Sequence, residues 1–375
     1  MRIVGIMTGT SLDCVDVAVV EFFETSKFTL LASGAIPINA EFREKILAIC
    51  NFTTTIKEVS QANFYLSHLY EQAVNAVLDA NGIPISTIDA VAIHGQTIWH
   101  NPTAEEYAGV AIASTLQLGC GSVLSALLQK TVVSDFRSAD IAIGGQGAPL
   151  VPIFDYYFLR DTAIYTIALN IGGIANITAI PPNATINNIM AYDTGAGNML
   201  IDAYMQQFYQ KDYDNDGEIA MSGVVNADML YGLLALPYYQ QPPPKSCGRE
   251  LFNAEYVSAV LPANIPKCDI IRTLTELTTM TISTEINKLT SAGRVIVKGG
   301  GVNNTCMMQL LRQYIAKDIE ILNSDAIGIS SKYYEAIAFA FLGYLTLSDV
   351  AGNVPNVTGA SQSIVLGSIS RNYKR

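Results

Sequence analysis

Residues 1–11 read Met-Arg-Ile-Val-Gly-Ile-Met-Thr-Gly-Thr-Ser, and the run Val-Asp-Val-Ala-Val-Val-Glu-Phe follows at residues 15–22. Both sides of this stretch are rich in apolar and β-branched side chains, and the small polar residues between them favour a turn. The stretch predicts a β-hairpin with strands at residues 2–7 and 15–22 and a turn at residues 8–11. A third strand is expected at residues 28–37.

The same order returns in the middle of the chain. Residues 163–170 and 175–180 predict two more strands, with Gly172-Gly173 between them. Two hairpin-led copies indicate a duplicated α/β fold. We place the change of domain at the glycine-rich stretch 144–149. This gives a first domain of residues 1–140 plus 356–375 and a second of residues 141–355. We expect the two hairpin turns to face each other across a cleft.

Periodicity predicts the remaining elements. Apolar residues at helical spacing indicate helices at residues 41–51, 60–81, 273–290 and 333–347, and short apolar runs indicate strands at residues 90–93, 131–134 and 294–297.

Composition excludes several classes of protein. The 375 residues carry 22 Lys+Arg against 33 Asp+Glu, a net charge of −11, and 50% of them are hydrophobic. This apolar content argues against disorder. The negative charge argues against nucleic acid or an anionic membrane as the main partner, since both attract clustered Lys and Arg.

Other features point to a cytoplasmic location without a metal centre held by Cys or His. The longest charge-free stretch, residues 107–129, is interrupted by glycines and reads as a strand, a turn and a helix. Asp13 and Asp16 interrupt the position of a signal-peptide core. The six cysteines form no C-x-x-C pair, and the three histidines form no H-E-x-x-H pattern.

Three glycine-containing turns are candidate nucleotide sites. Glycine lets backbone N–H groups approach an anion closely, so the turn that begins at Gly9 and the Gly172-Gly173 turn would grip a polyphosphate from two sides. Asp13 would hold Mg²⁺ through water. Gly299-Gly300-Gly301 follows an expected strand, where a flat group such as adenine would pack against the backbone. Taken alone, the turn at Gly9 is better explained as an ordinary hairpin turn, and the other two turns also have ordinary interpretations as connections. Neither a Walker A loop nor a Rossmann fingerprint is present.

Asp193 stands between an apolar run and a glycine turn, just before an expected helix that starts at Met199. A carboxylate there is either a helix N-cap or a catalytic base. In isolation the cap is favoured.

A set of polar residues follows expected strands of the first domain, where a small ligand would bind. The planar fork of Arg137 suits a carboxylate. The alternative is a group of solvated loop residues. The members of the set are His94, Gln96, Thr97, Trp99, His100, Asp135, Arg137 and Asp140. The stretch Pro242-Pro243-Pro244-Lys245 reads as a stiff basic loop at the surface.

Taken together, these motifs closely resemble the anhydro-N-acetylmuramic acid kinases, within the superfamily of sugar kinases, actin and heat-shock ATPases. The resemblance extends over nearly the whole chain and rests on the ordered set Met7-Thr8-Gly9-Thr10-Ser11-Leu12-Asp13, His94-Gly95-Gln96-Thr97, Asp135-Phe136-Arg137, residues 144–152, residues 169–176, Asp193-Thr194-Gly195, Pro243-Pro244-Lys245-Ser246, Gly248-Arg249-Glu250-Leu251-Phe252, residues 335–340 and residues 357–361.

The resemblance implies a two-domain actin-like, ribonuclease H-like fold with a central cleft. It implies an enzyme that uses ATP and water to open 1,6-anhydro-N-acetylmuramic acid and phosphorylate O6 during murein recycling, acting as a homodimer with Mg²⁺. Asp193 falls on the family's catalytic base. The ATP-binding set is Gly9, Thr10, Ser11, Leu12, Asp13, Cys14, Val15, Asp16, Gly172, Gly173, Gly299, Gly300 and Gly301. The sugar-binding set is His94, Gln96, Thr97, Arg137 and Glu335.

Several positions depart from the family pattern. Cys14 replaces the family's glycine, Cys120-Gly121 replaces Asp-Pro, and Ser138-Ala139 replaces two basic residues. Cys247 replaces Thr, and Lys298 replaces a small residue or Cys. Two alternatives stay open. One is a kinase for another anhydrosugar such as levoglucosan, and the other is a non-catalytic sugar sensor or assembly protein on the same fold.

Overall fold

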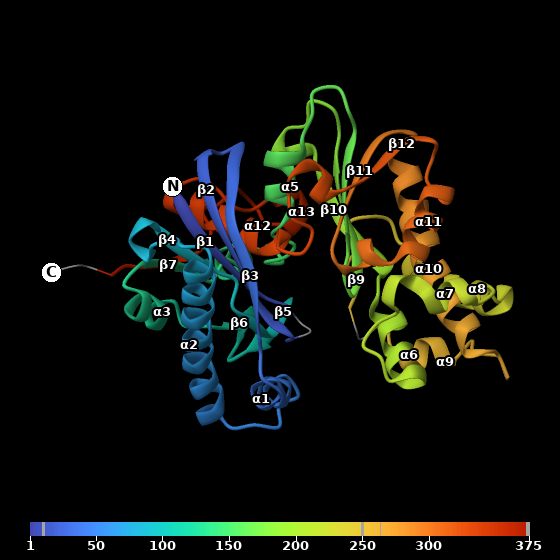
Figure 1. Ribbon diagram of the computed structural model, residues 1–375, viewed down its shortest axis with the longest axis horizontal. Coiled ribbons are helices and arrows are strands. Elements are labelled where there is room, and N and C mark those ends of the chain that lie inside the picture. Colours follow the sequence, from blue (N-terminus) through green and yellow to red (C-terminus); the bar gives the residue numbers. More distant parts are fainter. Residues whose placement is uncertain (10–11, 249–250, 263, 373–375) are drawn as a thin grey trace. The chain divides into compact units, whose positions relative to one another are not determined.

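The computed structural model describes residues 1–9, 12–248, 251–262 and 264–372 (Figure 1). The chain divides into two compact units. Unit 1 comprises Met1–Phe158 and Tyr333–Arg375, and unit 2 comprises Leu159–Lys332. The boundaries expected from the sequence were 140/141 and 355/356. Because unit 1 extends to Phe158, the loop at residues 144–149 lies inside unit 1 and not at a change of unit.

Unit 1 is built on one six-stranded sheet in the order β13-β7-β4-β1-β2-β3. The first hairpin forms as predicted: β1 and β2 pair antiparallel, with Met7 opposite Asp16 and Thr8 opposite Val15. Strands β4 and β7 continue the sheet in parallel on the other side of β1. The strands are β1 (Arg2–Thr8), β2 (Cys14–Glu24), β3 (Lys27–Pro37), β4 (Ala90–Ile93), β7 (Thr131–Ser134) and β13 (Ser368–Ser370).

Helices cover both faces of this sheet. The alternating side chains of β1 separate the faces: Val4 and Ile6 share an apolar cluster with α2, whereas Gly5 meets α12. A Cβ added to Gly5 would lie 1.9 Å from the Ala336 oxygen, so the helix backbone rests directly on the strand. The helices of unit 1 are α1 (Ala40–Cys50), α2 (Ile56–Ala80), α3 (Gly121–Leu128), α4 (Ser138–Ala142), α5 (Pro152–Leu159), α12 (Tyr334–Leu347) and α13 (Pro355–Thr358).

Aromatic packing explains why α5 and α12 belong to unit 1. Phe158 of α5 lies 4.9 Å from both the Phe28 and the Phe341 ring centroids. Phe22 of β2 lies 5.7 Å from Phe341 of α12. A sequence pattern does not show which sheet such rings pack against, and this is why the expected boundaries differ from the observed ones. Unit 1 also holds a separate hairpin of β5 (Gln96–Tyr107) and β6 (Val110–Leu118). The predicted strand and helix within residues 107–129 are β6 and α3, whereas β5 and its pairing with β6 were not predicted.

Unit 2 is built on a five-stranded sheet in the order β10-β9-β8-β11-β12. The second predicted hairpin forms from β8 (Thr166–Ile171) and β9 (Ile174–Ile180). The other strands are β10 (Met190–Ala196), β11 (Ala292–Lys298) and β12 (Asp318–Asn323). The helices are α6 (Met199–Tyr209), α7 (Glu218–Ser222), α8 (Ala227–Leu234), α9 (Ala254–Ser258), α10 (Lys267–Leu289) and α11 (Thr305–Tyr314).

The two units share one topology, which confirms the predicted duplication. In each, three antiparallel strands are followed by two parallel ones: β3-β2-β1-β4-β7 in unit 1 and β10-β9-β8-β11-β12 in unit 2. The fold class is therefore the α/β, actin-like one that the resemblance implies. The cleft between the units stays a prediction. Across the described ranges, no helix has the length and apolar character needed to cross a bilayer.

Candidate active site

Asp193 lies within strand β10, beside a break in the pairing with β9 between Asp193 and Gly195. Such bulges bend a strand and redirect its side chains, and they are frequent next to active sites. Helix α6 begins six positions along, at Met199, and Asn198 occupies the position before it. The alternative interpretation of Asp193 as a helix cap is therefore wrong.

The surroundings hold Asp193 at three of its atoms. Its Oδ2 accepts a hydrogen bond from the Cys247 backbone N–H at 2.9 Å, and its own N–H donates to the Lys245 oxygen at 3.0 Å. The Tyr238 hydroxyl donates to the Asp193 carbonyl at 2.7 Å. Burial raises the pKa of Asp193 to about 6, against the lowering effect of the Cys247 N–H. The carboxylate is thus charged at neutral pH and more basic than an exposed one, as a general base requires.

In space, the Gly172-Gly173 turn lies next to the N-terminus of helix α6. Asn198 N–H donates to the Gly172 oxygen at 2.8 Å, and Met199 N–H donates to the Gly173 oxygen at 3.1 Å. A Cβ added to Gly172 would approach no neighbour closer than 3.6 Å, and one added to Gly173 none closer than 3.8 Å. Packing of the described residues therefore leaves space at this turn.

The Gly299-Gly300-Gly301 run, the expected adenine contact, meets the end of β8. Gly299 has φ +83°, and a Cβ there would lie 2.6 Å from Asn170 Oδ1. A Cβ on Gly301 would lie 2.3 Å from Ile171 Cγ2, whereas one on Gly300 would meet only Asn198 Nδ2, at 4.0 Å. The outer two glycines serve internal packing, and the middle one borders open space.

That space is a cavity of about 490 Å³, within the range of sites for small ligands. The sequence analysis missed most of its polar lining, which comes from three separate segments and forms no local motif. Burial and the charge of Asp212 raise the pKa of Asp202 to about 7. The lining residues are Asn198, Ile201, Asp202, Tyr213, Asp214, Asn215, Asp216, Gly300, Asn303 and Asn304.

The first hairpin turn carries the other expected ATP-binding residues. Leu12 N–H donates to the Gly9 oxygen at 3.2 Å, and Leu12 has φ +57°. Cys14 Sγ donates to Asp16 Oδ1 at 3.4 Å, and Val15 is buried. Thr10 and Ser11 lie outside the described residues.

Asp13 is the expected magnesium contact. Its side chain is 59% exposed, and Oδ1 lies 3.3 Å from Arg43 Nη1 on α1. Among the described residues, no three Asp, Glu, His or Cys side chains gather as a metal cluster. Magnesium usually binds through one or two carboxylates, waters and substrate phosphates, so a single open carboxylate fits an indirect contact.

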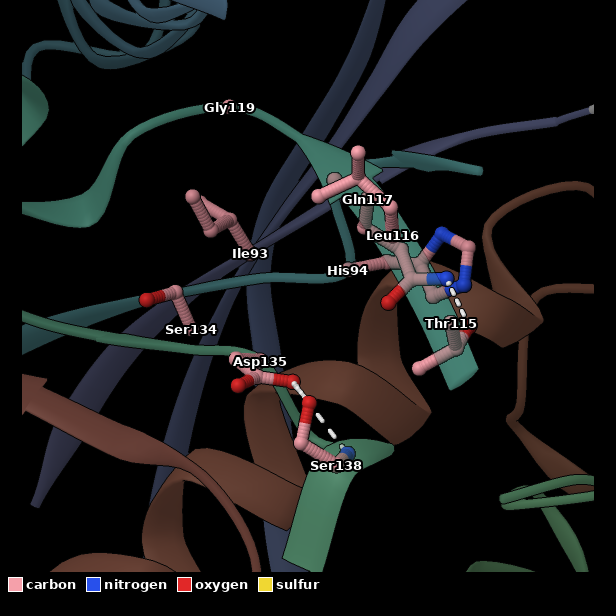
Figure 2. A pocket seen from close by; sticks show the side chains of 10 residues that line it. Ile93, His94, Thr115, Leu116, Gln117, Gly119, Ser134, Asp135 and Ser138 are labelled. Atoms are coloured by element: carbon pink, nitrogen blue, oxygen red, sulfur yellow. Dashed lines mark hydrogen bonds between the residues drawn. The ribbon is translucent and has the colours of Figure 1, made fainter. Parts of the chain in front are cut away.

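A polar pocket of about 140 Å³ lies where β4 and β7 end (Figure 2). Figure 2 shows Ser138 bonded to Asp135: its hydroxyl donates to Asp135 Oδ1 at 2.7 Å and its backbone N–H at 3.2 Å. The pocket brings His94, a predicted sugar-binding residue, together with Asp135, another member of the predicted polar set, and with residues outside that set. The lining residues are Ile93, His94, Gly95, Thr115, Leu116, Gln117, Gly119, Ser134, Asp135 and Ser138.

Arg137 lies against His94. Its Nη2 donates to His94 Nε2 at 2.7 Å, and its Nη1 donates to the Gly147 oxygen at 2.6 Å. Burial lowers the pKa of Arg137 to about 10, while the charge of Glu335 acts in the opposite direction. Burial and the Arg137 charge hold the pKa of His94 well below its usual range. At neutral pH the pair is therefore a charged guanidinium beside a neutral imidazole.

Three buried polar atoms in this region lack a hydrogen-bond partner among the described residues: His94 Nδ1, Gln96 Oε1 and Arg137 Nε. Because His94 Nε2 accepts from Arg137, the imidazole proton is on Nδ1. Buried polar groups are nearly always paired, so these atoms point to a polar ligand. Thr97 does not line the pocket itself, but its hydroxyl accepts a hydrogen bond at 3.4 Å from Gln117, which does.

A buried carboxylate fixes the loop at residues 144–149. Asp140 Oδ2 accepts from the Gly147 N–H at 2.8 Å, and Oδ1 accepts from Asn353 Nδ2 and Thr358 Oγ1, each at 2.8 Å. Since the Gly147 oxygen receives Arg137 Nη1, this network also orients the guanidinium.

A duplicated α/β fold, a carboxylate with a raised pKa in one unit and a polar pocket beside a buried arginine in the other are compatible with a small-molecule kinase, and the family match assigns the chain to that class. The chain belongs to the anhydro-N-acetylmuramic acid kinase family, whose model matches residues 1–372.

Curated relatives agree. The anhydro-N-acetylmuramic acid kinases of Vibrio vulnificus strains CMCP6 and YJ016 are each 40% identical over 370 residues, which cover 97% of this chain and 96% of the relative. Solved structures are more distant. The activator of 2-hydroxyisocaproyl-CoA dehydratase from Clostridium difficile has a TM-score of 0.44 at 13% identity, covering 91% of this chain and 93% of that one. The ROK hexokinase from Thermus thermophilus has a TM-score of 0.40 at 11% identity, covering 93% and 100%.

Proposed function

We propose that this chain uses ATP and water to convert 1,6-anhydro-N-acetylmuramic acid into N-acetylmuramic acid 6-phosphate and ADP. The observation that carries the proposal is Asp193, a carboxylate held by the Cys247 N–H in a bulged strand, with its pKa raised by burial to about 6. Family membership supplies the substrate.

Asp193 acts as the general base. The anhydro sugar has no free hydroxyl at O6, so the C1–O6 bond must break as O6 attacks phosphorus. Asp193 takes a proton from a water behind C1, and the water oxygen forms a bond to C1. The electron pair of the C1–O6 bond goes to O6, which bonds to the γ-phosphorus as ADP leaves. Attack from behind inverts C1, as in glycosidases that pair a base with a water.

Unit 1 holds the sugar. The protonated Arg137 guanidinium attracts the lactyl carboxylate, and its unpartnered Nε supplies a donor. His94 Nδ1–H and Gln96 Oε1 offer a donor and an acceptor to the acetamido group and hydroxyls. Glu335, exposed on α12 and close enough to influence Arg137, accepts from a sugar hydroxyl. Levoglucosan carries no carboxylate and gains nothing from Arg137.

The hairpin turns and the 490 Å³ cavity hold the nucleotide. The open turn at Gly172-Gly173 and the first hairpin, residues 9–16, bind phosphates. The cavity beside Gly300 takes the ribose and adenine. The ribose hydroxyls can donate hydrogen bonds to the carboxyl groups there. Magnesium, when bound near Asp13 through water, offsets the phosphate charge. We further propose that the enzyme is a cytoplasmic homodimer, and that its two units close around the substrates.

The test is coupled ADP release with 1,6-anhydro-N-acetylmuramic acid, levoglucosan and N-acetylmuramic acid. We expect turnover of the first sugar and at most a small rate with the others. Asp193→Asn keeps the shape but removes the base, and loss of a general base lowers rates by about 10²–10⁴-fold. Asp318→Asn, an exposed carboxylate of the same unit, is the matched control. Equal turnover of levoglucosan, or Asp193→Asn activity above about a tenth of wild type, would contradict the proposal.

A further inference from the structure

Glu285 on helix α10 is bonded to both chain segments that flank Asp193. Its Oε2 accepts from the hydroxyl of Tyr192, the residue before Asp193 in β10, at 3.2 Å. Its Oε1 accepts from Lys245 Nζ at 3.2 Å. The Lys245 and Glu285 side chains are only 2% and 7% exposed. Lys245, expected from its sequence to lie in a basic surface loop, is instead buried.

The segment that carries Lys245 also contacts Asp193 directly. The Lys245 oxygen accepts from the Asp193 N–H at 3.0 Å, and two residues later the Cys247 N–H donates to Asp193 Oδ2 at 2.9 Å. Lys245 Nζ lies 5.0 Å from the centre of the Tyr238 ring, whose hydroxyl donates to the Asp193 oxygen. The position of this segment therefore depends on where the lysine is anchored.

Stability alone is a weak reason for such a pair. A buried ion pair is often no more stabilising than apolar residues of the same size, because both charges lose their hydration. What this pair adds is geometric: one carboxylate ties strand β10 and the 245–247 segment to the same helix.

We propose that the Lys245–Glu285 pair positions the catalytic base, by fixing the 245–247 segment so that the Cys247 N–H stays directed at Asp193 Oδ2. The inference rests on the proposed role of Asp193. Lys245 and Glu285 are positioning residues, since they act on the base through Cys247 and Tyr192 and not on the substrate.

The Cys247 N–H stabilises the charged form of Asp193, so displacing it raises the pKa of Asp193. The acidic limb of the kcat–pH profile then moves to higher pH. The titratable and charged groups around the base are Tyr192 from β10, Tyr238, Tyr239, Lys245 and Cys247 from the 238–247 segment, and Glu285 and Lys288 from α10.

The experiment compares Lys245→Met, the double variant Lys245→Met/Glu285→Leu and Tyr192→Phe. The double variant leaves neither buried charge without its partner, and Tyr192→Phe removes one hydroxyl only, so each guards against misfolding of the single lysine variant. The control is Glu276→Gln, a buried glutamate on the same helix that pairs with Arg272 at 2.9 Å.

Each variant is assayed for kcat, the KM of both substrates, the kcat–pH profile and Tm. We expect Lys245→Met and the double variant to lose about tenfold or more in kcat at pH 7, because small misplacements of catalytic groups can cost about 10²-fold. Both KM values should stay within about twofold of wild type, and the acidic limb of the kcat–pH profile should move to higher pH. Tyr192→Phe should show the same pattern more weakly.

Two results overturn the inference: variants that lose Tm as Glu276→Gln does but keep kcat, or a fall in kcat with an unmoved or lowered acidic limb. Failure of the proposed function looks different, because then the wild-type enzyme itself does not turn over the anhydro sugar.

Discussion

Replacing the catalytic carboxylate should make the protein more stable at high pH. Asp193 has a pKa of about 6 in the fold, against an ordinary value of 3.8, because burial disfavours its charged form. The fold therefore loses stability as the pH rises through this window, and the full loss is present above pH 6. Asp193→Asn carries no charge at any pH, so it removes the loss.

The size of the effect follows from the shift. One pKa unit corresponds to about 1.4 kcal/mol, so the shift from 3.8 to about 6 gives about 3 kcal/mol at pH 8 and about half of that at pH 5. For a unit of this size, 1 kcal/mol moves Tm by roughly 2–4 °C. We expect the inactive Asp193→Asn to melt roughly 6–12 °C above wild type at pH 8.

The assay is calorimetric Tm of wild type, Asp193→Asn and the exposed-site control Asp318→Asn at pH 8 and pH 5. The control should follow wild type at both values. A Tm for Asp193→Asn at or below wild type at pH 8, or an equal difference at the two pH values, would refute the reasoning. Either result would mean that burying the charged Asp193 carboxylate does not lower the stability of the fold.

Three further outcomes are expected. Gly173→Ala should leave Tm unchanged but raise the ATP KM about tenfold, because phosphate is expected to bind at this turn. Gly301→Ala should lose about 1–3 kcal/mol of stability, because its Cβ would lie 2.3 Å from Ile171 Cγ2. The opposite pattern in KM and Tm would argue against the nucleotide assignment. Wild-type kcat should fall about tenfold per pH unit below pH 6 as Asp193 becomes protonated, and a flat profile down to pH 5 would count against the base. Arg137→Lys keeps the charge but loses the planar fork, so the KM for the anhydro sugar should rise about tenfold or more while the ATP KM stays constant, which steady-state kinetics with each substrate varied would show.

The hairpins β1–β2 and β8–β9 could be predicted because local sequence specifies them. Apolar β-branched runs on both sides of Gly9 and of Gly172-Gly173 favour strands and a turn without help from the rest of the chain. The family assignment was also accessible, since it depends on an ordered set of motifs and not on packing.

The environment of Asp193 could not be predicted from local sequence. Strand β10 contains Asp193 and Gly195, both poor strand formers, and exists because it pairs with β9. Lys245 follows three prolines and looks solvent-exposed, and only the fold brings Glu285 to it. The cavity beside Gly300 likewise draws Asp202 and Asn304 from separate segments. Such features arise from tertiary contacts, which local patterns do not record.

The division of the chain has a consequence for biosynthesis. Unit 2 is one continuous stretch, Leu159–Lys332, inserted into a unit 1 whose last part begins at Tyr333. During translation unit 2 can complete its contacts early, because domains generally fold as units as they leave the ribosome. The N-terminal hairpin cannot, since Gly5 of β1 rests on the backbone of α12, which is synthesised after all of unit 2. The face of β1 that carries Gly5 therefore stays uncovered until unit 2 and α12 have both been synthesised.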